Sequence, residues 1–215
     1  MAPAKRSRIY VIAGVNGAGK SSIGGATFRA RGAEYYNPDE AARCILARNP
    51  GLSQTDANSA AWHQGVRLLR RAIAERKDFA FETTLGANTI TRLLQEAATQ
   101  GIEIHVWYVG LASAQLHIER VEVRVRAGGH AIAPDLIERR YEQSRINLID
   151  LMPHLAELRV HDNSIDADPT TRKPPKPKLL LHMKGRRIIN LNDLKDTPDW
   201  AKPILAVALK LHNAK

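Results

Sequence analysis

Cysteine occurs only once in this chain, as Cys44. A single cysteine excludes an internal disulfide and a zinc site built from cysteines, and it favours a reducing, cytoplasmic environment. Long apolar runs are also missing, because none approaches the roughly 20 residues that a membrane-spanning helix needs. The basic segment 1–8 is not followed by a signal-type apolar segment with a cleavage site. We therefore expect a cytoplasmic protein without a membrane contact.

Acidic residues are scarce in the last part of the chain. The 215 residues carry a net charge of +10, and residues 169–215 hold 11 Lys and Arg against 3 Asp and Glu. Residues 1–168 hold 21 Lys and Arg and 19 Asp and Glu, so this main body is nearly neutral. Its composition argues against a nucleic-acid-binding surface. The basic tail is either a solvated surface or a contact for an acidic partner.

Two signatures of nucleotide-hydrolysing proteins are missing as well. No expected strand has four apolar residues followed by Asp-Glu, and the strand expected at 102–109 is followed by Gly110 and Leu111. This argues against the large motor-type ATPases, which hold Mg²⁺ with such an Asp. The Asn-Lys-x-Asp pattern that selects guanine in GTPases is also absent.

One pattern that is present organises the chain. Residues 14–21 read Gly-Val-Asn-Gly-Ala-Gly-Lys-Ser, a P-loop pattern placed directly after the apolar run 9–13. The glycines let several backbone N–H groups point at one anion, and the helix that follows adds the positive end of its dipole. We expect Lys20 to reach the β- and γ-phosphates and the Ser21 hydroxyl to hold Mg²⁺. The predicted nucleotide-binding residues are Gly14, Asn16, Gly17, Ala18, Gly19, Lys20, Ser21 and Ser22.

Strands and helices alternate along most of the chain, which predicts a parallel sheet covered on both sides. Strands are expected at 8–14, 34–36, 78–84, 102–109 and 158–162, and helices at 19–31, 37–48, 53–77, 88–100, 113–126 and 134–151. A Pro/Lys-rich linker at 170–177 precedes an expected hairpin, with strands 179–183 and 187–191, and a last helix at 199–212. The predicted fold is a three-layer α/β P-loop sandwich with five to six mainly parallel strands. We expect residues 1–168 to form the P-loop domain, with a helical lid at about 113–150, and residues 169–215 to pack on it as an extension.

Ligands of such sheets bind at the carboxyl ends of the strands, so the P-loop, Asp39 and residues 82–84 should face one crevice. Phosphoryl transfer to a hydroxyl needs a carboxylate that orients the acceptor and takes its proton, and we assign this role to Asp39. Glu82, Thr83 and Thr84 are candidates for binding the acceptor. The alternatives are that Asp39 only stabilises the start of its helix and that Glu82 faces solvent.

Two arginine-rich helices joined by a glycine-containing loop predict a lid. Arg120 and Arg124 lie four residues apart and share a helix face, and Arg139 and Arg140 lie on the next helix. Closed over the phosphates, such arginines would neutralise charge in the transition state, so Arg120 and Arg124 are predicted to be catalytic together with Lys20 and Asp39. His130, beside two glycines, is a candidate for contact with substrate. The alternatives are surface arginines paired with nearby acids and a loop histidine without a role.

Taken together, these motifs resemble the zeta-toxin-like P-loop kinases over about residues 8–165. The resemblance rests on residues 14–22, 37–40, 81–85 and 120–130, followed by Arg139-Arg140-Tyr141, and the Gly-Gly-His sequence is typical of a chromosomal branch. It implies a cytoplasmic kinase that uses ATP and Mg²⁺ to phosphorylate a hydroxyl of UDP-N-acetylglucosamine, and an antitoxin that blocks the nucleotide site. By the same resemblance Asp39 is the base, and Glu82 with Thr84 bind the acceptor. Asn37 departs from the family, which tends to carry an acid there.

Other functions remain open at this point. Chloramphenicol-type phosphotransferases look related too, so the acceptor can be another small hydroxyl compound. A second hypothesis is an NTP-binding regulatory protein, poor at catalysis, whose basic tail engages an acidic partner. A third is a kinase for nucleic-acid ends, which the tail charge suggests and the neutral main body disfavours.

Overall fold

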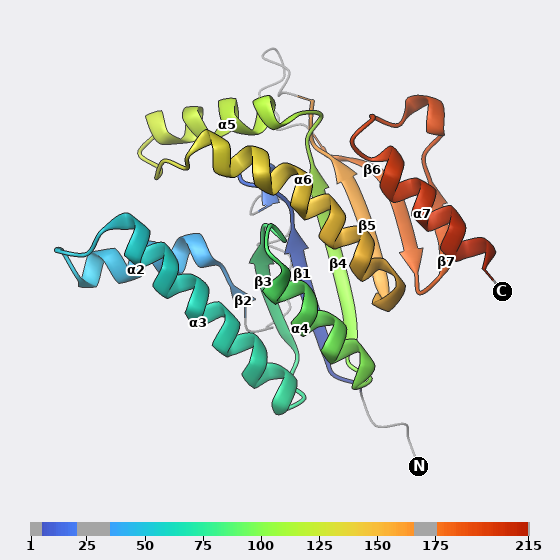
Figure 1. The fold of residues 1–215 in the computed structure, drawn as a ribbon, viewed down its shortest axis with the longest axis horizontal. Coiled ribbons are helices and arrows are strands. Elements are labelled where there is room, and N and C mark those ends of the chain that lie inside the picture. Colours follow the sequence, from blue (N-terminus) through green and yellow to red (C-terminus); the bar gives the residue numbers. More distant parts are fainter. Residues whose placement is uncertain (1–5, 21–34, 166–175, 215) are drawn as a thin grey trace.

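The computed structural model describes residues 6–20, 35–165 and 176–214, and these contain one seven-stranded sheet (Figure 1). Its strand order is β2-β3-β1-β4-β5-β6-β7. The first five strands in this order are parallel, while β6 runs antiparallel to β5 and β7 antiparallel to β6. The strands are β1 (Arg8–Ala13), β2 (Tyr35–Tyr36), β3 (Phe79–Thr83), β4 (Glu103–Gly110), β5 (Glu157–Asp162), β6 (Lys178–Lys184) and β7 (Arg187–Leu191).

Six α-helices occur in the described ranges. They are α2 (Pro38–Arg48), α3 (Gln54–Ala74), α4 (Asn88–Thr99), α5 (Ala114–Arg126), α6 (Pro134–Leu151) and α7 (Lys202–Asn213), with short 3₁₀ turns η2 (Met152–His154) and η3 (Leu194–Asp196). In these ranges no helix combines the length and the apolar character needed to cross a bilayer. The predicted α/β class is confirmed, and the sheet is wider than the predicted five to six strands because the hairpin continues it. Beyond Lys20, the helix expected at 19–31 lies outside the described residues.

The main hydrophobic core lies between the sheet and helices α3, α4, α6 and α7, which cross the same face of the sheet in Figure 1. Helices α3 and α4 contribute Leu69 and Leu94 to it, both without exposed surface. Successive side chains of a strand point to opposite faces, so the alternate residues Ile9 and Val11 of β1 meet these helices. The core thus fixes the carboxyl ends of the central strands relative to α3 and α6, the two helices that border the cavity described below.

The start of α2 is fixed by the predicted cap. The Asn37 side chain accepts hydrogen bonds from the backbone N–H groups of Asp39, at 2.9 Å, and Glu40, at 3.3 Å. Pro38 occupies the first turn, where its missing N–H costs nothing. This cap places Asp39 immediately after β2, at the edge of the sheet where the P-loop also lies.

The C-terminal segment is part of the same sheet. Strand β6 pairs with β5, and the Trp200 indole lies against Gly110 at the end of β4, where an added Cβ would meet the indole ring at 2.4 Å. The Trp200 Nε1–H donates to an Asp162 carboxylate oxygen at 3.3 Å. These contacts connect the hairpin and α7 to the strand ends next to the P-loop.

Candidate active site

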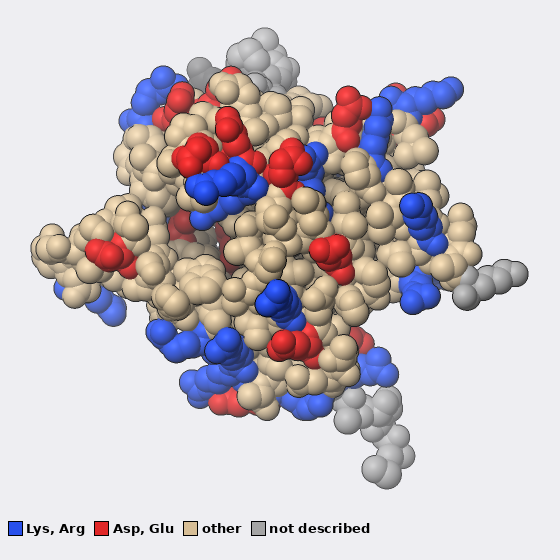
Figure 2. Space-filling model, in the orientation of Figure 1, with Lys and Arg blue, Asp and Glu red and all other residues tan. Residues whose placement is uncertain are grey.

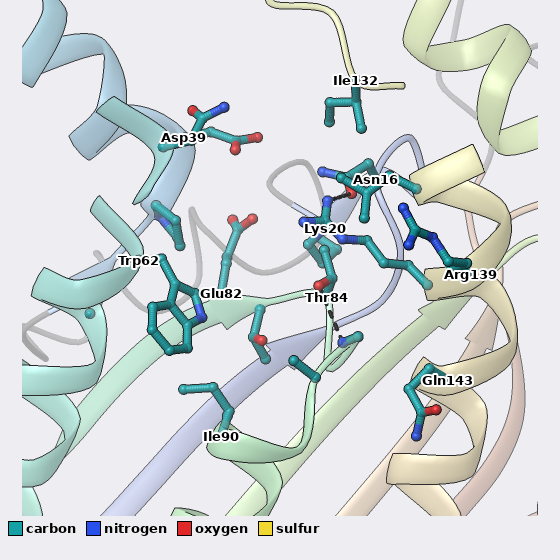
Figure 3. A pocket seen from close by; sticks show the side chains of 18 of the residues that line it. Asn16, Lys20, Asp39, Trp62, Glu82, Thr84, Ile90, Ile132, Arg139 and Gln143 are labelled. Atoms are coloured by element: carbon teal, nitrogen blue, oxygen red, sulfur yellow. Dashed lines mark hydrogen bonds between the residues drawn. The ribbon is translucent and has the colours of Figure 1, made fainter. Parts of the chain in front are cut away.

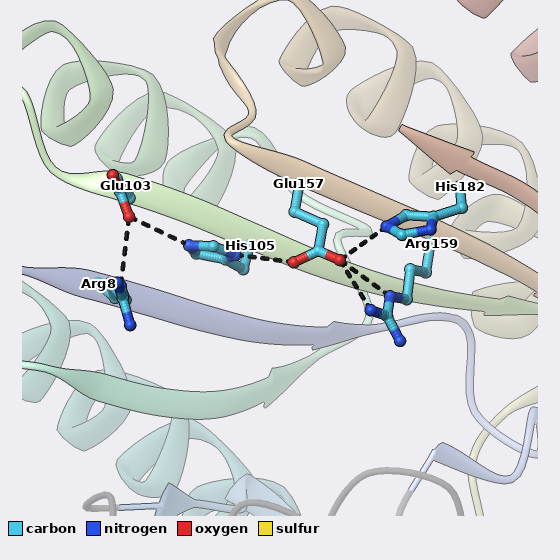
Figure 4. A network of polar contacts seen from close by, with 6 residues as sticks. All are labelled: Arg8, Glu103, His105, Glu157, Arg159 and His182. Atoms are coloured by element: carbon cyan, nitrogen blue, oxygen red, sulfur yellow. Dashed lines mark hydrogen bonds and ion pairs between the residues drawn. The ribbon is translucent and has the colours of Figure 1, made fainter. Parts of the chain in front are cut away.

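A cavity of about 1120 Å³ opens at the carboxyl ends of the strands, between α3 on one side and α6 on the other (Figure 3). Figure 2 shows this face of the molecule hollowed between the α2–α3 pair and the lid helices. The volume is sufficient for a nucleotide-sized or drug-sized ligand. The cavity brings together these predicted residues: Asn16, Lys20, Asp39, Glu82, Thr83, Thr84 and His130. The prediction that the P-loop, Asp39 and residues 82–84 face one crevice is confirmed.

The P-loop backbone has the geometry that its glycines permit. Gly14 has φ +141° and Gly17 has φ +83°, both in the region that L side chains rarely adopt. A Cβ on Gly14 would lie 2.2 Å from the Val109 carbonyl oxygen, so the loop lies tightly against β4. Two N–H groups of the loop are used within the protein: that of Gly14 donates to the Thr83 carbonyl at 3.2 Å and that of Ala18 to the Val15 carbonyl at 3.1 Å. Ser21 and Ser22, the predicted magnesium and phosphate ligands, lie outside the described residues.

Lys20 lies among charges of both signs. Burial lowers the pKa of Lys20, the carboxylates of Glu82 and Asp39 act to raise it, and the guanidinium groups of Arg124 and Arg140 act to lower it further. Its Nζ donates to the Val15 carbonyl at 3.4 Å. Two acids and two arginines thus act on the same ammonium group, an arrangement suited to a ligand with several negative charges.

Asp39 contacts α5 and the loop that follows it. Its carboxylate oxygens lie 3.6 Å from Arg124 Nη1 and 3.9 Å from His130 Nε2. Burial lowers the pKa of His130, and the opposing attraction of Asp39 is the smaller effect. The Asp39 side chain is about half exposed, so its carboxylate is accessible from the cavity while the lid holds its position.

The lid arginines differ in what they reach. Arg140 lines the cavity and donates from Nη1 to the Asn16 side-chain oxygen at 2.9 Å, so it crosses from α6 to the P-loop. Arg120 donates from Nη1 to the Asn163 carbonyl at 2.8 Å, and Asn163 in turn donates to the Ala18 carbonyl at 2.9 Å. Within the described lining of the cavity, Arg140 is present while Arg120 and Arg124 are not. The structure therefore brings Arg124 to Asp39 and places Arg120 against the loop after β5.

Glu82 is buried, with 5% of its surface exposed, and it accepts a hydrogen bond from the Tyr35 hydroxyl. This excludes the alternative of a solvent-facing acid at the strand end. The next residues form a sharp turn in which the Thr83 and Thr84 hydroxyls accept from the N–H groups of Leu85, at 3.1 Å, and Gly86, at 3.3 Å.

Leu85 completes this turn in the left-handed region, at φ +50°, although it is a fully buried leucine. Its carbonyl accepts from Asn147 Nδ2 of α6 at 2.6 Å, and the Asn147 side-chain oxygen accepts from Gln143 at 2.9 Å. Backbone in this region costs a leucine about 1–2 kcal/mol, so surrounding contacts must hold it. Helix α6 therefore holds the turn that presents Thr84 to the cavity.

Two further residues at the site were not found from the sequence. His117, on α5, is buried, and its Nδ1 lies 2.7 Å from the Asn16 backbone carbonyl. Because a carbonyl can only accept, Nδ1 carries the proton, and burial lowers the pKa of His117 to about 4. Trp62, on α3, lines the cavity. The 55, 58, 62, 66 spacing on α3 marks one helix face, but a spacing alone does not tell what that face meets.

Comparison with known proteins places this chain among P-loop kinase-like folds. The family model described as AAA domain matches residues 9–147. An uncharacterized protein of Haemophilus influenzae is 32% identical over 137 residues, which is 63% of this chain and 94% of that protein. The AvrRxo1-ORF1:-ORF2 crystal structure with ATP superposes with a TM-score of 0.67 at 11% identity, over 95% of this chain. This chain spans only 64% of that longer one.

A second structural relative is the PezAT chromosomal toxin–antitoxin system of Streptococcus pneumoniae. It has a TM-score of 0.53 at 13% identity and covers 98% of this chain and 88% of its own. At these identities the two structures establish the fold, an α/β P-loop kinase-like sandwich, and the fold alone.

Proposed function

This chain belongs to the AAA domain family, and we propose that it is an ATP-dependent kinase that transfers the γ-phosphate to a hydroxyl group of a small molecule. One observation carries the proposal: the P-loop residue Lys20 and the carboxylate of Asp39 face the same cavity. A phosphate cradle beside an accessible carboxylate is what phosphoryl transfer to an alcohol needs. The ATP in the AvrRxo1-ORF1:-ORF2 crystal structure supports the choice of nucleotide.

In the proposed reaction the P-loop N–H groups and Lys20 bind the phosphates of ATP. Asp39 accepts the proton of the acceptor hydroxyl as that oxygen bonds to the γ-phosphorus, and the bond to the β–γ bridging oxygen breaks to release ADP. Ser21 is the proposed Mg²⁺ ligand, and that ion would neutralise charge on the β- and γ-phosphate oxygens. Glu82 and Thr84 are proposed to position the acceptor.

Two lid arginines are proposed to neutralise the charge on the transferring group. Arg140 is already at the P-loop, 2.9 Å from Asn16, and Arg124 lies beside Asp39. Arg120 would have to release the Asn163 carbonyl to reach a phosphate. We therefore propose that Arg120 supports the P-loop, while Arg124 and Arg140 act on the substrate.

The acceptor and the partner are proposed on narrower grounds. The sequence resemblance names UDP-N-acetylglucosamine as the first acceptor to test and leaves an antibiotic alcohol as an alternative. The two structural relatives are a two-component complex and a toxin–antitoxin system, which supports an antitoxin-like protein partner for this chain. We also propose a cytoplasmic location, which the single cysteine supports. The competing proposal is an NTP-binding regulatory protein.

The test is acceptor-dependent turnover. The protein, ATP and Mg²⁺ are incubated with a metabolite extract, with UDP-N-acetylglucosamine and without any acceptor, and phosphorylated products are identified by mass spectrometry. Asp39→Asn should abolish turnover and leave ATP binding intact, while Glu40→Gln in the same first turn of α2 should change neither. ATP binding without any acceptor-dependent product would favour the regulatory protein. Salt-dependent phosphorylation of oligonucleotide ends would favour a nucleic-acid kinase.

A further inference from the structure

The cavity has a second end, on the side away from the P-loop. Its wall is formed by side chains of α3, β3 and α4, and its apolar members are Trp62, Val66, Phe81 and Ile90. Figure 3 shows Trp62 and Ile90 across the cavity from Arg139 and Gln143, with Glu82 between Trp62 and Lys20. A ligand bound at both ends would therefore have one part at the phosphate cradle and another against this aromatic wall.

Trp62 is not used for the core of the protein. Its side chain belongs to none of the hydrophobic clusters of the described residues, whereas α3 packs into them through other positions, such as Ala61, Val66 and Leu69. Trp62 keeps 39% of its surface exposed. A large indole on a cavity wall, with unused area, offers a face for stacking a flat ring.

The charged side chains of this wall further limit the class of ligand that can bind there. The residues that α3, β3 and α4 contribute to the described lining include the acid Glu82 and no basic side chain. Across the cavity, α6 adds the acids Glu138 and Glu142. The Lys and Arg residues of the described lining are Lys20 and Arg140, both at the phosphate end, and Arg139, whose Nη2 donates to Asp135 of its own helix at 2.8 Å. His130 also lines the cavity, with its Nε2 3.9 Å from the Asp39 carboxylate. A phosphate bound beside Trp62 would thus face the three acids Glu82, Glu138 and Glu142 with one arginine, Arg139, and that arginine is already paired with Asp135.

Resting on the proposed kinase function, we propose that the acceptor is a ring-bearing alcohol without phosphate groups, neutral or positively charged. Its ring stacks on Trp62 and its hydroxyl reaches Asp39. Of the acceptors left open above, this class includes the antibiotic alcohols, and it excludes UDP-N-acetylglucosamine, whose diphosphate would lie among acids.

Matched pairs of acceptors test the charge preference. Uridine and uridine 5′-monophosphate form one pair, N-acetylglucosamine and UDP-N-acetylglucosamine a second, and chloramphenicol and kanamycin supply a neutral and a cationic antibiotic. In the uridine and N-acetylglucosamine pairs, we expect the phosphate-free member to have the higher kcat/KM. Glu138→Lys replaces an acid of the cavity lining by a base, so it should reduce the ratio of the two kcat/KM values. A preference of tenfold or more for UDP-N-acetylglucosamine or uridine 5′-monophosphate overturns the proposal.

Variants of Trp62 test the stacking. Stacking on an aromatic side chain is worth about 1–3 kcal/mol per ring, so Trp62→Ala should raise the acceptor KM by about 5–150-fold while the KM for ATP stays within twofold. Trp62→Phe keeps a ring and should recover most of the loss. Gln64→Ala, an exposed residue of the same turn of α3 outside the cavity lining, is the matched control; His63 is not used, because its ring contacts the edge of Trp62 at 4.9 Å between ring centroids. An unchanged acceptor KM in Trp62→Ala overturns the proposal.

Binding separates a failure of this inference from a failure of the kinase proposal. If ATP binds and no acceptor is phosphorylated, the kinase proposal fails, and calorimetric titration with uridine and uridine 5′-monophosphate then decides the ring subsite. Tighter binding of uridine to the wild type, lost in Trp62→Ala, supports the subsite. The subsite is contradicted if uridine binds the wild type and Trp62→Ala with equal affinity, or if neither uridine nor uridine 5′-monophosphate binds the wild type.

Discussion

Replacing Asn147 by alanine tests whether α6 holds the turn after β3. Asn147 is buried, and its amide donates to the carbonyl of Leu85 at 2.6 Å across 62 positions of sequence. Alanine removes the donor and leaves a buried carbonyl without this partner, which costs about 1–3 kcal/mol. It also removes the contact that keeps a leucine in the left-handed region. We expect Asn147→Ala to lower the free energy of unfolding by about 2 kcal/mol, or the melting temperature by about 4–8 °C.

The assay is urea unfolding followed by circular dichroism, read together with acceptor kinetics. Gln143→Ala is the matched control, because it removes only the outer hydrogen bond to Asn147 and should cost about 1 kcal/mol or less. Asn147→Asp should be worse than alanine, since a carboxylate then faces a carbonyl oxygen. The acceptor KM should rise in Asn147→Ala, because the turn presents Thr84. Wild-type stability in both Asn147 variants would refute the reasoning.

Three further predictions concern the rest of the site and its supports. Gly110→Ala should destabilise the fold by about 1–3 kcal/mol, because the new methyl meets the Trp200 ring; thermal unfolding measures this, with Gly51→Ala, which has open space around it, as the neutral control. His117 has a pKa of about 4 in the folded protein against 6.5 in the unfolded chain. The unfolded state therefore takes up the proton first, and the free energy of unfolding should fall as the pH drops from 6.5 towards 4, by about 2 kcal/mol at pH 5. His117→Asn keeps a donor and removes the titration, so urea midpoints at pH 7.5 and 5.0 should differ less than in the wild type, and an unchanged difference contradicts the assignment. Arg140→Gln should lower kcat by about 10³–10⁵-fold with little change in ATP affinity, and a loss of affinity with kcat preserved would show ground-state binding instead.

The sequence predicted the elements well because their signals are local. The apolar run before the P-loop, the Asn37 cap and the hairpin around Gly185 each depend on neighbouring residues, and each appears where expected, within one or two residues. The meeting of the P-loop with Asp39 and Glu82 was also predictable, since parallel strands end at one edge of the sheet.

What could not be predicted depends on contacts between distant segments. The carbonyl partner of Arg120 and the choice of Arg140 for the P-loop follow from how α5 and α6 are rotated over the sheet. No pattern in the sequence records that rotation. Trp62 and His117 were missed for the same reason: each lies on a helix face, and only the packing decides whether the face meets a cavity, a loop or solvent.

Helix α6 is anchored at three levels along its length. Arg140 bonds to the P-loop, Ser144 shares a buried hydrogen bond of 3.0 Å with Tyr108 of β4, and Asn147 bonds to the turn after β3. A helix attached in this way cannot move away from the sheet as a rigid body without breaking buried hydrogen bonds. Because α5 is also held, by His117 at the Asn16 carbonyl and by Arg120 at the Asn163 carbonyl, the connection 127–133 is the part between the two helices that can change conformation without breaking these hydrogen bonds.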